Sequence, residues 1–325
     1  MSRRMMLVSL CALLILVAGP VLSVKSEGLN QTDTKPEIVK VGIYLIRAGS
    51  LDISTGAIDV DFYIEFTCPT ACGDKTDFEI INGTSKSKVL LPDPTNPDAD
   101  KEPAYRVAAT VFQEVNLRKY PFDSHDIRII IESSNYDDSV VKYVVNDETT
   151  AIDPKVFILG WDFDDTPPKA SAEIVNQYYE AWDLNYTRYV FSTPISKPAL
   201  AGWLKGLLPA IFIALGSIFA LFITSKNIGN RVAIITSSLV ASVLYHLNFT
   251  SRVPPIGYLT YGDIFMIINY IIILISLALT IWIIRSDGPD RQPLVARVNK
   301  IEIVAIPGLW FVLHILNAVL ILGQK

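Results

Sequence analysis

The sequence predicts an all-β domain followed by an all-α domain of four membrane-spanning helices. Short segments of alternating apolar and polar residues occupy the first half of the 325-residue chain. Four long apolar segments occupy the second half, and a shorter one stands at the N-terminus. Half of the residues are hydrophobic and 19% are charged, a composition too apolar for one water-soluble globule.

The N-terminal apolar segment has the features of a secretory signal. Residues 5–22 are almost uninterruptedly apolar, follow Arg3 and Arg4, and lead to the small residue Ser23. The sequence therefore predicts a signal peptide over residues 1–23. The alternative, an uncleaved anchor helix, would be expected to have a longer apolar run.

Residues 24–197 are predicted to form the β domain. In Ile58–Phe66 every second side chain is apolar, the pattern of a strand with one buried face. Similar segments are Val107–Val115, Ile127–Glu132, Val140–Val145 and Tyr186–Phe191. Turn signals such as Asn82-Gly83 separate them. Many short strands at this spacing indicate a β sandwich or a barrel.

The β domain is acidic, because Asp and Glu clearly outnumber Lys and Arg between residues 25 and 197. This charge disfavours nucleic acid as a partner and favours cations nearby, although an acidic surface also simply confers solubility. Cys68 and Cys72 are close in sequence, and in an oxidising compartment they predict a disulfide. We expect no metal site there, since no further ligands lie nearby.

Nothing in the sequence indicates an enzyme or a cofactor. The three histidines, His125, His246 and His314, are far apart in the sequence, and no nucleotide-binding or hydrolase motif occurs.

Residues 198–325 are predicted to form the membrane domain. The predicted spans are residues 199–224, 230–251, 258–284 and 301–323, with a linker at 285–300. The first and third short loops between the spans hold most of the Lys and Arg residues, whereas the second holds only Arg252. The positive-inside rule therefore places the linker in the cytoplasm and the β domain outside the plasma or inner membrane.

The second span is unusually polar for a helix in lipid, which is costly unless its polar side chains face protein or water. Steps of three and four residues trace one face of this helix, here called the stripe. Its members are Ala233, Ser237, Val240, Leu244, Leu247 and Ser251. If several copies surround an axis, the stripe would line a pore, with Val240, Leu244 and Leu247 as a hydrophobic gate. Alternatively, the hydroxyl groups could simply hold neighbouring helices together.

Four motifs resemble those of prokaryotic pentameric ligand-gated ion channels, in the Cys-loop receptor superfamily. They are Lys119–His125 (a proline-containing loop), Phe157–Asp162 (a strand motif), Asn230–Val240 (the pore helix) and Tyr258–Phe265 (the start of the third span). The loop disulfide of animal members is lacking, because Gln113 and Ile127 stand at the matching positions.

The resemblance implies a homopentamer in lipid membrane that conducts inorganic ions in response to a small ligand or protons. It also implies an immunoglobulin-like sandwich, and a second span that lines the pore. Residues matching those that couple the two domains in the family are Asp52, Tyr120, Pro121, Phe122, Asp123, Lys197, Pro254 and Tyr258. In particular, Asp52 and Asp123 would meet the basic residue Lys197. Lys197 replaces the Arg that is usual in the family, and a lysine cannot form the bidentate hydrogen bonds of an arginine with a carboxylate.

The resemblance also implies a ligand cleft lined by aromatic residues, which could enclose a cation. The matching residues are Tyr136, Tyr178, Tyr179 and Trp182. Tyrosines on a β sandwich also commonly serve in packing. The alternative function is a non-conducting, membrane-anchored ligand sensor, which would not need the stripe.

The predicted pore helix lacks the glutamate ring that cation-selective members carry at its cytoplasmic end. Gly229, Asn230 and Arg231 occupy that region. Fixed positive charge without a compensating acid favours anions, whereas the acidic β domain favours cations, so the sequence predicts an anion-preferring or poorly selective pore. His246 lies off the stripe and is expected to be a packing residue.

Overall fold

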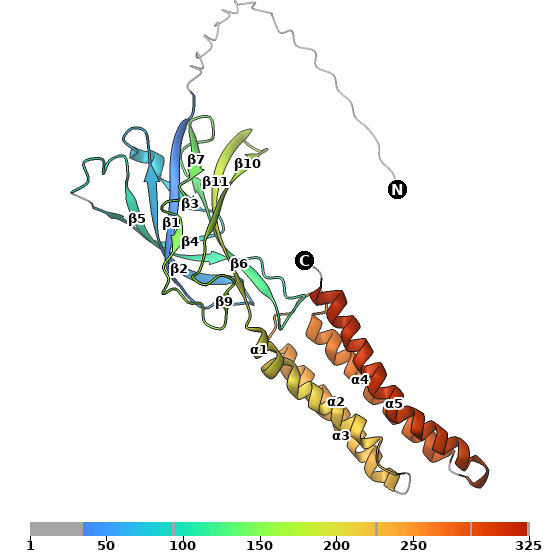
Figure 1. The fold of residues 1–325 in the computed structure, drawn as a ribbon. Coiled ribbons are helices and arrows are strands. Elements are labelled where there is room, and N and C mark those ends of the chain that lie inside the picture. The colour runs from blue at the N-terminus through green and yellow to red at the C-terminus, as the bar shows by residue number, and fades with distance from the viewer. Residues whose placement is uncertain (1–34, 93–94, 225–226, 287, 324–325) are drawn as a thin grey trace, which may run out of the picture. The chain divides into compact units, whose positions relative to one another are not determined.

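The computed structural model describes residues 35–92, 95–224, 227–286 and 288–323. The predicted signal peptide, residues 1–23, lies outside this part of the chain. The described residues form a β sandwich followed by four long apolar helices (Figure 1). The predicted fold class is therefore confirmed.

The first sheet has six strands, in the order β4-β5-β2-β1-β7, with β8 also beside β1. Its strands are β1 (Glu37–Ala48), β2 (Ala57–Thr67), β4 (Gly83–Leu91), β5 (Ala104–Phe112), β7 (Val141–Val145) and β8 (Ala151–Ile152). β7 and β8 run parallel to β1, and the other neighbours are antiparallel.

The second sheet has five strands, in the order β10-β11-β6-β3, with β9 also beside β11. Its strands are β3 (Phe78–Ile80), β6 (Ser124–Ser133), β9 (Asp162–Phe163), β10 (Ser171–Tyr179) and β11 (Leu184–Ser196). All pairs in this sheet are antiparallel. A short helical turn, η1 (Gly73–Thr76), precedes β3.

The core of the sandwich forms from the alternating apolar residues of both sheets. Ile58, Val60, Phe62, Ile64 and Phe66 of β2 are all buried in one cluster with apolar residues of β6 and β11. Burial of apolar surface between two sheets is the main favourable contribution to such a fold.

Four helical segments are each long enough and apolar enough to cross a membrane. The first segment comprises α1 (Ala199–Ala201), η2 (Gly202–Leu207) and α2 (Leu208–Ala220). The second and third segments are α3 (Ile228–Thr250) and α4 (Tyr261–Arg285). The fourth comprises η4 (Pro289–Arg291), α5 (Gln292–Asn317) and η5 (Ala318–Leu322).

Three helix starts differ from the sequence prediction, and α3 differs least, since it begins at Ile228 instead of 230. α4 begins at Tyr261 rather than 258, because Thr260 and Asp263 form a capping box that satisfies the free N–H groups at its first turn. α5 begins at Gln292, inside the predicted linker 285–300. The sequence prediction followed apolar content, and here the helix extends beyond its apolar part.

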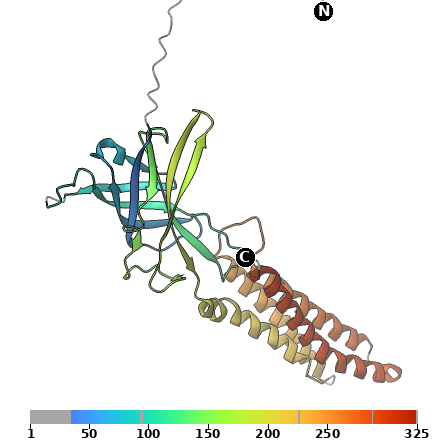
Figure 2. The same ribbon diagram turned by 45° about the horizontal axis from the view of Figure 1, so that its top comes forward.

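α4 is the central helix of the bundle. It packs against α2, α3 and α5, and α2 also packs along α3. Figure 2 shows the four helices side by side. Of the most apolar part of each helix, 44% is buried in α4 but only 11% in the α5 segment. α5 is therefore the most peripheral of the four.

Candidate functional site: the α3 helix and its contacts with the β sandwich

The stripe predicted in the second span, from Ala233 to Ser251, lies on α3 and its C-cap and is called the α3 stripe from here on; it is a continuous exposed face of the chain. All six of its residues are exposed, and its apolar part, Val240, Leu244 and Leu247, is 60%, 62% and 63% exposed. Ser238 and Ser242, by contrast, are buried on the bundle-facing side of α3. Those two hydroxyls thus serve helix packing, whereas Ser237 and Ser251 remain on the open face.

Arg231 points away from the α3 stripe into the bundle. Its side chain is 1% exposed, and its Nη2 lies 2.5 Å from Glu302 Oε1 on α5. By sequence, Arg231 is expected to carry an uncompensated positive charge that favours anions. The structure corrects this expectation, because the buried carboxylate of Glu302 balances the charge of Arg231.

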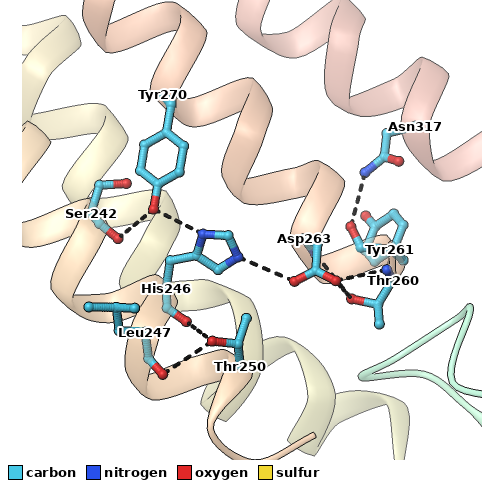
Figure 3. Close-up of polar contacts among 9 residues, drawn as sticks. All are labelled: Ser242, His246, Leu247, Thr250, Thr260, Tyr261, Asp263, Tyr270 and Asn317. Carbon is cyan, nitrogen blue, oxygen red and sulfur yellow. Dashed lines mark hydrogen bonds and ion pairs between the residues drawn. The ribbon is translucent and has the colours of Figure 1, made fainter. Parts of the chain in front are cut away.

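His246 joins α3 to the first turns of α4 (Figure 3). Its Nδ1 lies 3.0 Å from Tyr270 Oη, and its Nε2 lies 3.2 Å from Asp263 Oδ1. The other carboxylate oxygen of Asp263 accepts hydrogen bonds from the backbone and side chain of Thr260. Asp263 therefore caps α4 and contacts α3 at the same time. No pattern in the sequence connects His246 with Asp263.

The proline-containing loop, Lys119–His125, packs on the ends of the helices nearest the β sandwich. The N–H groups of Tyr261 and Gly262 donate to the carbonyls of Arg118 and Tyr120, at 2.8 and 3.1 Å. The Tyr120 ring packs against Phe249 near the end of α3, 5.1 Å between centroids. Burial raises the pKa of Tyr120. This loop thus links β6 to both α3 and α4.

Pro121 and Phe122 lie against η2 at the start of the first span. A Cβ on Gly206 would come within 2.9 Å of Pro121, and one on Gly202 within 2.8 Å of the Phe122 ring. The two glycines allow this close approach. Phe122 also contacts Trp203 and Tyr261.

The loop between α3 and α4 reaches the β sandwich through Tyr258. The Leu117 N–H donates to Tyr258 Oη at 3.0 Å, and the Arg118 guanidinium lies over the Tyr258 ring. Pro254 is half-buried, next to Val253, which packs on the cluster of Leu117, Tyr120 and Phe249.

Lys197 lies between an acid and two aromatic rings. Its Nζ is 3.8 Å from Asp123 Oδ1, 4.8 Å from the Tyr120 centroid and 5.0 Å from the Trp161 centroid. Asp123 is buried, and its other oxygen lies 3.1 Å from His125 Nε2. The sequence analysis did not identify His125 and Trp161 as members of this cluster.

Asp52 does not join this cluster, contrary to expectation. Its carboxylate accepts hydrogen bonds from Ser54 N–H and Thr55 Oγ1, both at 2.8 Å, within its own turn. These hydrogen bonds, the one from the Ser54 backbone foremost, lower the pKa of Asp52. An Asp two residues before a free N–H commonly closes such a turn.

The four aromatic residues of the predicted ligand cleft do not come together. Tyr179 and Trp182 pack 5.6 Å apart at the β10–β11 hairpin. Tyr178 precedes Tyr179 on β10 and therefore points to the opposite face, where it bonds Asp183. Tyr136 Oη donates to the carboxylate of Asp74, within η1. Only Tyr179 and Trp182 remain as a pair.

A buried charged group lies behind this aromatic pair. Glu132 accepts hydrogen bonds from Tyr179 Oη at 2.9 Å and from Arg188 Nε at 2.7 Å. Burial raises the pKa of Tyr179, and its hydrogen bond to Glu132 acts in the same direction. The pairing of Glu132 with Arg188 was not predicted. A signal for it exists, because a charged residue inside a predicted strand needs a partner if it is buried.

Cys68 and Cys72 form a disulfide in the structure. It lies at the edge of the sandwich core, where both residues are buried. Among residues 35–323, outside the gaps stated above, no group of His, Cys, Asp and Glu side chains is placed to hold a metal ion.

Comparison with known proteins agrees with this architecture. No model of a known protein family matches the chain. The chain is 23% identical, over 312 residues, to the "Proton-gated ion channel" of Gloeobacter violaceus (strain ATCC 29082 / PCC 7421). That similarity covers 89% of this chain and 84% of the relative. The relative is an ion channel and not an enzyme. Together with the four apolar helices, this similarity identifies the chain as a multi-pass membrane protein related to an ion channel.

Proposed function

We propose that the chain is one subunit of a homopentameric ligand-gated or proton-gated ion channel of the prokaryotic type. The observation that carries the proposal is the α3 stripe. It is continuous and exposed on one subunit, with small or hydroxyl-bearing residues at both ends and three large apolar residues between them. Five such faces around an axis would form a pore with wet mouths and a hydrophobic constriction.

The contacts at the outer ends of the helices support gating by the β sandwich. The proline-containing loop contacts α3 through Phe249 and α4 through Tyr261 and Gly262. A displacement of β6 would therefore reach the stripe helix directly. In this proposal residues 24–197 lie outside the plasma or inner membrane after removal of the signal peptide 1–23.

Two stimuli fit the contacts. Protons would act where a titratable side chain joins moving helices, as His246 and Asp263 do. A cationic ligand would act at the pair of Tyr179 and Trp182. The name of the Gloeobacter relative favours protons.

The test is current through bilayers containing the purified protein, recorded while the bath is stepped between about pH 8 and pH 5 and with small amines added. We expect a stimulus-dependent current. Val240→Ser and Leu244→Ser remove apolar surface from the constriction, so each raises spontaneous opening by about tenfold, a change of roughly 1.4 kcal/mol.

Val243→Ser is the matched control, because Val243 is exposed on α3 but lies outside the stripe. Its spontaneous current should equal that of the wild type. Ligand binding without current under any condition would instead support the membrane-anchored sensor, which conducts nothing.

A further inference from the structure

The strongest unassigned feature is a buried charged cluster that joins α3, α4 and α5 at the cytoplasmic end of the bundle. Arg231 Nε donates to Thr280 Oγ1 of α4 at 2.9 Å. Its Nη1 donates to Asn299 Oδ1 of α5 at 2.9 Å, and its Nη2 donates to Glu302 Oε1 at 2.5 Å. One side chain of the stripe helix is therefore held by two other helices.

The charge of this cluster balances within the cluster. Arg231 and Glu302 are 1% and 2% exposed, so neither charge is screened by water. A buried guanidinium without a counter-charge is strongly unfavourable. Thr280 and Asn299 are neutral, so Glu302 supplies the negative charge of the cluster. Glu302 lies outside the four motifs that resemble those of the channel family.

The cluster lies behind the α3 stripe, not on it. Arg231 precedes Ala233 by two residues, a turn of about 200° around the helix, so it leaves the opposite side of α3. An α-helix is about 10 Å across with its side chains. A charge at that distance, separated from the proposed pore by protein of low dielectric constant, still acts on ions at the inner mouth.

We propose that Glu302 is a selectivity-determining residue of this channel, because it cancels the positive charge of Arg231 behind the inner mouth. The inference rests on the proposed function. With Glu302 ionised, Arg231 contributes no net preference for anions. Without that carboxylate, each subunit adds one unscreened positive charge near the permeation path, and the preference moves toward anions.

The test is the reversal potential across a NaCl gradient, measured for the full-length protein in bilayers. Glu302→Gln is expected to raise the chloride-to-sodium permeability ratio several-fold over the wild type. Arg231→Gln is expected to lower it, since Glu302 then stands uncompensated. The double variant carries neither charge and is expected to return to the wild-type value.

Two further variants guard against simple misfolding. Glu302→Asp keeps the negative charge with a shorter side chain, so it should keep the wild-type reversal potential even if less protein assembles. If Glu302→Gln does not assemble, the exchanged pair Arg231→Glu with Glu302→Arg restores the charge balance, and its reversal potential should match that of the wild type. The reversal potential of Arg231→Gln alone should still shift.

An unshifted reversal potential in conducting Glu302→Gln channels would overturn the inference and leave the channel itself intact. A double variant that shifts as far as Glu302→Gln would do the same, because the effect would then not come from charge. Absence of current from the wild type would reject the proposed function, and this inference with it.

Discussion

Glu65 on β2 is a half-buried carboxylate at the edge of the sandwich core. Burial, and secondarily the negative charge of Glu102, raise its pKa. A carboxyl group with a raised folded-state pKa stabilises the fold most when it is protonated. Its contribution is fully present below the unfolded-state pKa and is lost as the pH rises through the folded-state pKa.

We therefore predict that Glu65→Gln melts at a higher temperature than the wild type at neutral pH, because Gln needs no proton to remain neutral. The difference should vanish in acid, where Glu65 is itself protonated. Thermal unfolding in detergent at both pH values measures this. Glu173→Gln, at an exposed position of β10, is the control and should follow the wild type at both; a gain independent of pH would contradict the argument.

Single residues also show what sequence could and could not provide. That Arg231 leaves α3 opposite the stripe follows from helical geometry, but its partner Glu302 lies 71 residues away and no local pattern points to it. The turn around Asp52 could have been predicted from the sequence, because Asp, Ser and Thr side chains commonly hydrogen-bond the backbone within turns, and Ser54 and Thr55 follow Asp52 closely. The resemblance to a family had instead assigned Asp52 to Lys197.

At the scale of elements, His246 joins the last turns of α3 to the first turns of α4, where Asp263 and Tyr270 face its ring (Figure 3). Protonation of the imidazole converts its hydrogen bond with Asp263 into an ion pair, because that partner is a carboxylate. Acid would thus change how firmly the stripe helix is held.

We predict that His246→Gln, whose amide can keep a hydrogen bond to Asp263 but cannot form an ion pair with it, weakens the response of the current to acid. The ion pair is worth about 1 kcal/mol, or roughly a fivefold change in the gating equilibrium. Current against pH provides the measurement. Tyr270→Phe removes only the neutral partner, so its pH response should resemble the wild type more closely than that of His246→Gln. Identical pH curves for His246→Gln and the wild type would exclude this role.

Elements whose pattern is local were predicted well. The alternation in Ile58–Phe66 matches β2, and the apolar content located all four helical spans. β1 was not predicted, although every second residue from Val39 to Leu45 is apolar and buried and the strand lies inside its sheet. The positions of the predicted ligand-cleft residues could not be predicted for a different reason: the distance of Tyr136 from the hairpin is set by loop packing, which strand patterns do not encode.

At the scale of the whole molecule, the α3 stripe needs a partner that one chain does not provide. Ser237 and Ser251 are exposed on the same face as three large apolar side chains. In lipid those hydroxyls would lack water, whereas around a shared axis they would face an aqueous path.

We predict that the detergent-purified protein is a pentamer. Electron microscopy should show five-fold particles, and native mass spectrometry should give the mass of five chains. Because the pore needs the whole ring, monomers or particles of another symmetry would count against the proposed assembly.

The peripheral position of α5 has a consequence for the membrane itself. Most of the apolar surface of this helix lies outside the protein bundle, so lipid acyl chains must cover it. The same helix supplies the carboxylate that balances Arg231. A bilayer whose thickness tilts α5 would therefore move that carboxylate relative to the guanidinium, and the composition of the host membrane would act on ion preference without any change in the protein.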